Sequence, residues 1–213
     1  LGIVHLFVWF KQKSQVAHLL FFALAVSATA FGAFELTMMQ APSATAYAAT
    51  LRWAHVPAAV LVLTMVWFVR FHFNAGRLWL AWAACGFRLA GLALNFVTGV
   101  NVNFLEVSAL DRLTLWGDAV VAVPVGSASP WAIVPQIGNL LLIAFVVDAS
   151  LTLWRRGGAD ARRRALVVGG GVVICIAAVA GFAALTTLGL VLDELTVKPG
   201  TAGSIVIDEL GLY

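Results

Sequence analysis

The sequence contains little charge. Only 11% of its 213 residues are Asp, Glu, Lys or Arg, while 62% are hydrophobic. Soluble domains carry about 25% charged and about 45–50% apolar residues. So few charges would not cover the surface of a soluble domain of this length, which excludes that class. The composition instead predicts an integral membrane protein.

Several chemical signatures are also missing. The only two cysteines, Cys85 and Cys175, lie inside apolar runs, which argues against a disulfide framework. No lysine lies in a predicted span, which excludes a retinal Schiff base. The sequence has neither a Gly-Lys-Ser/Thr phosphate loop nor a His-Glu-x-x-His zinc motif. We therefore expect no enzymatic activity and no cofactor in this chain.

Five apolar runs are long enough to cross about 30 Å of hydrocarbon. They predict helices over about 16–39, 47–71, 78–97, 131–153 and 165–190. Residues 1–10 form half a span, so the chain is expected to be a fragment that lacks the outer part of its first helix. Residues 204–213 fit a truncated last span or an outer segment equally well, because Asp208 and Glu209 are costly in hydrocarbon.

The predicted fold class is all-α. We expect an integral membrane helical bundle with five full spans and one or two partial spans, forming a single domain over residues 1–213. The one long connection, at about 98–130, is predicted to be an outer loop that caps the bundle. Within it, 105–116 favours a short amphipathic turn on the membrane interface, and 120–125 is apolar and β-prone.

Basic residues predict the orientation. Alternate loops carry nine basic residues on one side and three on the other, a bias typical of a cytoplasmic first side. We therefore expect a multi-pass protein of the bacterial inner membrane with its basic loops in the cytoplasm. The nine are Lys11, Lys13, Arg70, Arg77, Arg155, Arg156, Arg162, Arg163 and Arg164, and the three are Arg52, Arg112 and Lys198.

Polar side chains inside the spans form the candidate site, because each is costly in hydrocarbon unless it is paired or hydrated. Glu35 is predicted to meet Arg52 or His55, which lie at a similar depth on the next, antiparallel helix. Arg88 lies near mid-membrane, with Asp148 as its candidate counter-ion.

Asn95 falls on the same helix face as Arg88, because Cys85, Arg88, Leu92 and Asn95 are three, four and three residues apart. The polar set has two interpretations. One is a structural network that fixes helix register, and the other is an outward-opening pocket whose donors contact a small ligand. Metal and haem sites are weaker hypotheses. His18 with His72 is the one sensible haem pair, and Met38, Met39 and His55 could form a copper site.

Nine short stretches between residues 5 and 170 have a characteristic order and spacing. They are 5–9, 34–39, 51–57, 68–70, 80–82, Arg88 with 95–96, 101–103, 145–149 and 154–157. In these stretches the chain resembles the multi-span N-terminal sensor region of bacterial membrane histidine kinases. The match weakens after about residue 118, where Gly117-Asp118 replaces an expected Gly-Glu pair.

The resemblance implies a seven-span input module with its N-terminus outside and its output domain inside. It also implies ligand contacts at seven positions, namely Glu35, Arg52, His55, Arg88, Asn95, Asn101 and Asn103. We therefore predict a signal-input domain that detects an extracytoplasmic or membrane-borne ligand and relays it to a cytoplasmic effector.

The expected partners are the lipid bilayer, a cytoplasmic output domain or partner protein, a small ligand and a second copy of the chain in a homodimer. No nucleic acid partner is expected. One alternative is a non-catalytic accessory subunit of a larger membrane complex. A second is a small transporter or haem-bearing electron carrier.

Overall fold

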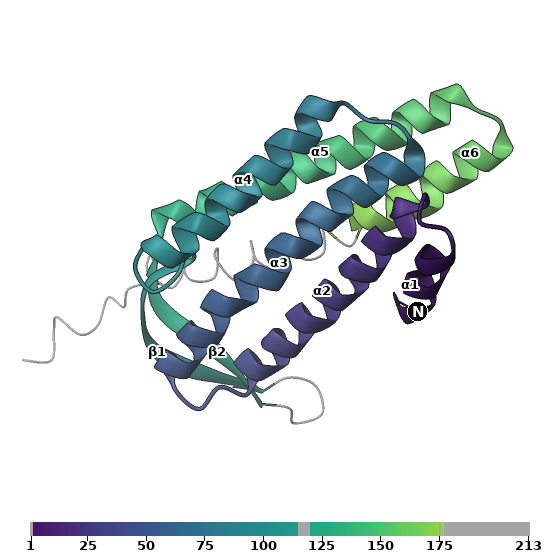
Figure 1. Ribbon diagram of the computed structural model, residues 1–213. Helices are drawn as coiled ribbons and strands as arrows, with labels where there is room; N and C mark the ends of the chain where they lie inside the picture. Colours follow the sequence, from purple (N-terminus) through teal and green to yellow (C-terminus); the bar gives the residue numbers. More distant parts are fainter. Residues whose placement is uncertain (1, 115–119, 175, 177–213) are drawn as a thin grey trace, which may run out of the picture. The chain divides into compact units, whose positions relative to one another are not determined.

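The computed structural model describes residues 2–114, 120–174 and 176 (Figure 1). Helix α1 (Gly2–Lys11) is followed by three long helices, α2 (Val16–Met39), α3 (Ala44–Phe73) and α4 (Leu78–Val97). Strands β1 (Phe104–Thr114) and β2 (Val120–Ala128) come next. The short 3-10 helix η2 (Pro130–Ala132) leads into α5 (Ile133–Arg156), then α6 (Ala159–Arg164) and a π-helical turn, η3 (Ala165–Gly169).

Four of these segments are long and apolar enough to cross a membrane. They are α2, α3, α4 and the continuous segment Pro130–Arg156. These four predicted spans are confirmed, and the limits of α2 and α4 agree with the sequence prediction to the residue. The count of five full spans is not confirmed, because most of the predicted span over 165–190 lies outside the described residues. Residues 204–213 also lie outside them.

The structure is mostly helical, as predicted, but the connection after α4 contains a β-hairpin that the all-α prediction did not include. β1 pairs with β2 in an antiparallel sheet, from Phe104 opposite Ala128 to Thr114 opposite Val120. The amphipathic turn predicted over 105–116 is therefore not formed within the described part of that segment. The apolar, β-branched run at 120–125 gives the first strand a partner, and cross-strand bonds satisfy backbone groups that a lone turn would leave open.

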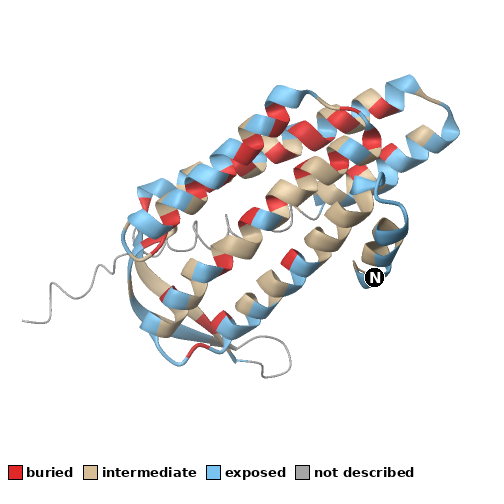
Figure 2. Cartoon of the chain, in the orientation of Figure 1, coloured by how far each residue is buried: buried red, intermediate tan, exposed pale blue. Residues whose placement is uncertain are grey.

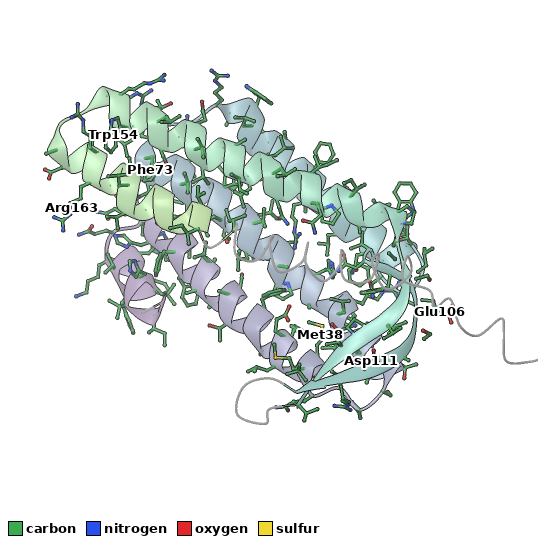
Figure 3. The ribbon with its side chains drawn as sticks, turned by 180° about the vertical axis from the view of Figure 1, so that it is seen from behind. Met38, Phe73, Glu106, Asp111, Trp154 and Arg163 are labelled. Atoms are coloured by element: carbon green, nitrogen blue, oxygen red, sulfur yellow. The ribbon has the colours of Figure 1, made fainter. Side chains whose placement is uncertain are left out.

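The hairpin defines one end of the helices, which we call the hairpin end. It contains the end of α2, the start of α3, the end of α4 and the start of α5. β1 contacts α3 and β2 contacts α2. The opposite end contains the turns 12–15, 74–77 and 157–158, and we call it the arginine end. Figure 3 shows Glu106 and Asp111 on the hairpin, and Trp154 and Arg163 at the arginine end.

The core lies between α3, α4 and α5. Each of these helices has seven buried positions, whereas α2 has only Ser27 and Met38 (Figure 2). Buried residues of α4 recur three and four positions apart, the spacing of one helix face. Val66, Phe145 and Val146 are among the fully buried side chains at the centre of this core.

Two glycines bring α4 and α5 into close contact. A Cβ added at Gly91 would lie 3.2 Å from the Cβ of Pro135, and one at Gly138 would lie 3.3 Å from the backbone nitrogen of Arg88. Small residues at such crossings let helix backbones approach each other. The contact places residue 138 of α5 at the level of residue 88 of α4.

Candidate functional site

A polar cluster at the hairpin end joins α3 to α4. Asn95 is fully buried, and its Nδ2 donates a hydrogen bond to the carbonyl of Arg52 at 2.8 Å. In the opposite direction, Arg52 Nη2 donates to the carbonyl of Phe96 at 2.8 Å. Each side chain therefore binds the backbone of the other helix. This geometry fixes the two helices in register.

The same asparagine holds the base of the hairpin. Asn95 Oδ1 accepts a hydrogen bond from the backbone N–H of Val102 at 3.2 Å. Asn101 is also fully buried, and its Oδ1 accepts from the N–H groups of Asn103 and Phe104, both at 2.9 Å. Asparagine commonly closes turns in this way. The hairpin is thus attached to α4 through the Asn95 amide, and the Asn101 amide closes the turn at its base.

Asn103 contributes its backbone to this cluster. Its carbonyl accepts from the N–H of Ser129 at 2.8 Å, which closes the hairpin where β2 ends. Its side chain makes no hydrogen bond with another described residue. A further tie comes from Arg112 on β1, whose Nη2 donates to the carbonyl of Ala41 at 3.1 Å. Sequence reasoning did not identify that contact.

Two buried donors in the cluster have no acceptor among the described residues. They are Arg52 Nε and Asn101 Nδ2. An unpaired buried donor costs about 1–3 kcal/mol, so most native donors find an acceptor. Both exceptions lie on residues that the sequence singled out as candidate ligand contacts.

Deeper in the bundle, Arg88 is buried, with 9% of its surface exposed. Its guanidinium makes no hydrogen bond and no ion pair with another described residue. His55 on α3 is close enough to interact electrostatically with Arg88. The Nδ1 atom of His55 lies 2.8 Å from the carbonyl of Leu51 and donates to it, so His55 does not supply a counter-charge.

The predicted Arg88–Asp148 pair is wrong. Asp148 binds Arg77 instead, accepting from its backbone N–H at 2.8 Å and pairing with its Nε at 3.5 Å. The reason is depth along the helices. Because Gly138 lies level with Arg88, Asp148 is ten residues nearer the arginine end, or about 15 Å at 1.5 Å per residue.

The predicted contact of Glu35 with Arg52 or His55 is also absent. Glu35 instead interacts electrostatically with Tyr47, in the first turns of α3. Helix α3 starts at Ala44, three residues before the predicted start, so Arg52 and His55 lie deeper in the bundle than Glu35. Of the eight predicted site residues, the structure joins Arg52 and Asn95 directly. It places Asn101 in the turn that Asn95 binds through Val102, and His55 within electrostatic range of Arg88.

The arginine end holds polar contacts that sequence reasoning missed. Arg156 Nη1 donates to the carbonyl of Asn74 at 2.9 Å, and Arg70 Nη1 donates to that of Ala75 at 3.4 Å. These bonds satisfy carbonyls of the α3–α4 turn. Counting basic residues by loop revealed the bias, but the contacts depend on which helix ends meet. The tight turn Asn74-Ala-Gly76 was the one sequence feature that indicated where these helix ends meet.

The described residues contain no group of three or more His, Cys, Asp and Glu side chains that could hold a metal ion. The copper hypothesis relies on methionines and the haem hypothesis on two histidines, so both stay predictions. His18, the proposed haem partner of His72, has its Nδ1 atom 2.8 Å from Nδ1 of His5. One ring of that pair must donate the hydrogen bond and the other must accept it.

Comparisons with protein-family models, with curated proteins and with solved structures find no match to this chain. The resemblance to a sensor region is neither supported nor opposed by them, and it stays a prediction. The features of this chain that bear on its function are therefore the polar cluster at the hairpin end and the arginine end.

Proposed function

We propose that the chain is a membrane signal-input domain. A small ligand carrying hydrogen-bond acceptors binds among the polar residues near the hairpin end, and the helices pass the change to the arginine end. The nine-to-three distribution of basic residues supports a cytoplasmic arginine end, and hence a hairpin that faces the outside. An output domain or partner protein in the cytoplasm would receive the signal.

The observation that carries this proposal is a surplus of buried donors. Among the described residues, Arg52 Nε and Asn101 Nδ2 are buried and have no acceptor. Arg88 is 9% exposed, and its guanidinium has no hydrogen bond or ion pair with a described residue. All three groups donate hydrogen bonds, and two belong to cations. A carboxylate or another oxygen-rich group would satisfy them, because each of its oxygens accepts more than one bond.

A connected path supports relay from the hairpin to the arginine end. Asn95 binds both the hairpin base and α3, so a change at the hairpin acts directly on α4. The contact between Gly91 and Pro135 couples α4 to α5. At the far end, Asp148 of α5 binds Arg77, the residue of the α3–α4 turn that precedes α4. Shifts of about 1–2 Å in packed helices are a common form of signal transmission.

Replacement of Arg88 by Met tests the proposal. If Arg88 is kept for a ligand, the ligand-free Arg88→Met protein should be more stable by at least about 1 kcal/mol, because a buried charge is removed. If Arg88 is paired structurally, the same change should cost about 3–5 kcal/mol. Arg163→Met is the control, because Arg163 is exposed and its loss should change stability by less than about 0.5 kcal/mol.

The measurement is thermal unfolding of the purified chain in lipid nanodiscs, repeated with sodium acetate, succinate and citrate as probes. We expect at least one carboxylate to raise the unfolding temperature of the wild type but not of Arg88→Met, with sodium chloride at equal ionic strength as the reference. A destabilised Arg88→Met protein, together with no carboxylate effect on the wild type, would contradict the proposal.

A further inference from the structure

The arginine end contains a polar cavity of about 300 Å³. It lies where the α3–α4 turn meets the last two turns of α5. Its wall includes four arginines, which come from three different segments: Arg70 from α3, Arg77 from the turn, and Arg155 and Arg156 from α5. Arginines that only anchored a loop at the membrane surface would not need to converge on one cavity.

The charge in this cavity is strongly positive. The four arginines face a single acidic residue, Asp148, which leaves a formal charge of +3. Asp148 is already engaged with the backbone N–H and the Nε of Arg77. The carboxylate therefore fixes the position of one arginine and leaves the other three without an acidic partner among the cavity residues.

The turn carbonyls are engaged as well. Asn74 accepts from Arg156, and Ala75 accepts from Arg70. Each of these bonds uses one N–H of a guanidinium that carries five. The bonds hold both guanidinium groups at the wall while most of their donors stay open. Such a cavity suits an anion with several acceptor oxygens, and arginine matches the geometry of phosphate well.

The level of the cavity along the helices indicates where the phosphate comes from. The cavity lies at the end of α3, the start of α4 and the end of α5, all three of which are apolar membrane-length helices. Large apolar side chains adjoin it in sequence and are exposed: Phe71, Leu78 and Trp79 each have half or more of their surface accessible. Acyl chains can lie against these side chains while the headgroup reaches the arginines.

We propose that this cavity is a phosphate-binding site occupied by the headgroup of an anionic phospholipid. The lipid would fix the α3–α4 turn against the end of α5. The site is separate from the polar cluster at the hairpin end, so it stands or fails independently of the proposed sensor function.

Native mass spectrometry of the detergent-purified chain tests the site, with phosphatidylglycerol and cardiolipin as probes and phosphatidylcholine as the reference. We expect the wild type to retain the anionic lipids preferentially. The double variant Arg155→Gln/Arg156→Gln should bind them at least about tenfold more weakly. Arg163→Gln/Arg164→Gln removes the same charge from exposed positions of α6 outside the cavity, and should stay within about twofold of the wild type.

A variant that binds lipid more tightly than the wild type provides a control for misfolding, because a misfolded protein would lose binding. Asp148→Asn removes the only negative charge of the cavity, so it should tighten anionic lipid binding by a few fold. Equal losses in both double arginine variants would overturn the proposal, because the arginines would then act as a diffuse charge. Thermal stabilisation by inorganic phosphate, with no further effect of phosphatidylglycerol, would assign the cavity to a soluble phosphate compound and overturn the lipid assignment.

Discussion

Asn95 and Arg52 bind each other's helices in opposite directions. The Asn95 amide donates to the Arg52 carbonyl, and the Arg52 guanidinium donates to the carbonyl of Phe96, the residue that follows Asn95. The two contacts are both 2.8 Å long. Because they cross at the point where the hairpin begins, they connect the position of the hairpin with the packing of α3 on α4.

Replacement of Asn95 by Leu should destabilise the fold by about 1–3 kcal/mol, because it leaves the Val102 N–H unpaired and removes the bond to the Arg52 carbonyl. Asn103→Leu is the matched control, since the Asn103 side chain makes no hydrogen bond with a described residue. Chemical or thermal unfolding in nanodiscs measures both. Equal effects of the two variants would show that the Asn95 bonds add nothing to stability.

Replacement by alanine should lower the stability of the fold at Gly76 and raise it at Gly86. Gly76 has a φ of +94°, and an added Cβ would lie 2.8 Å from a ring carbon of Phe145. Gly76→Ala should therefore cost at least about 2 kcal/mol, from backbone strain and overpacking. Gly86 lies inside α4 with nothing within 4 Å of an added Cβ, so Gly86→Ala should stabilise by roughly 0.5–1 kcal/mol. Unfolding temperatures of the two variants provide the test.

Asp148→Asn should have a small effect on stability. The Arg77 side chain is 68% exposed and that of Asp148 is 24% exposed, so solvent screens their ion pair. We expect a loss of less than about 1 kcal/mol in the absence of lipid. The loss should shrink as salt is raised. Asp111→Asn, at an exposed position of β1, is the control. A salt-independent loss of about 3–5 kcal/mol would instead indicate that Asp148 neutralises a buried charge.

Cysteine labelling tests the proposed orientation. Ser127→Cys lies at an exposed position of β2, and Ser14→Cys lies in the exposed turn after α1. Both are made in a chain whose Cys85 and Cys175 are replaced by Ala. In intact bacterial cells, a membrane-impermeant maleimide should label position 127 but reach position 14 only after lysis. The reverse pattern would invert the orientation, and labelling of both positions would show that the cells leak.

The sequence predicted the helices well because hydrocarbon imposes one clear requirement, a run of about 20 apolar residues. α2 and α4 follow from that rule alone. The hairpin was not predicted. Residues 120–125 showed β propensity, but the partner strand mixes Glu106, Ser108 and Asp111 with apolar residues and does not alternate clearly.

The pairing of polar side chains was harder to predict, since it depends on helix depth and rotation. A start of α3 three residues earlier than predicted was enough to separate Glu35 from Arg52. Asp148 was assigned to Arg88 because both are charged and intramembrane, but their levels differ by several turns. Asn95 was correctly placed on the same face as Arg88, since spacing within one helix needs no knowledge of its neighbours.

The contrast between α2 and α4 has a consequence for biogenesis. With mean hydropathy 1.9 in its most apolar window and only two buried residues, α2 can leave the translocon and enter the bilayer alone. α4 carries Arg88 and Asn95, and an arginine at a helix centre opposes insertion by about 2.5–3.5 kcal/mol. Insertion of α4 is therefore more favourable when α3 is already in the membrane, because the Arg52 carbonyl accepts the Asn95 amide only when both helices are in place. Because α3 precedes α4 in the chain, it is synthesised first and is available when α4 inserts.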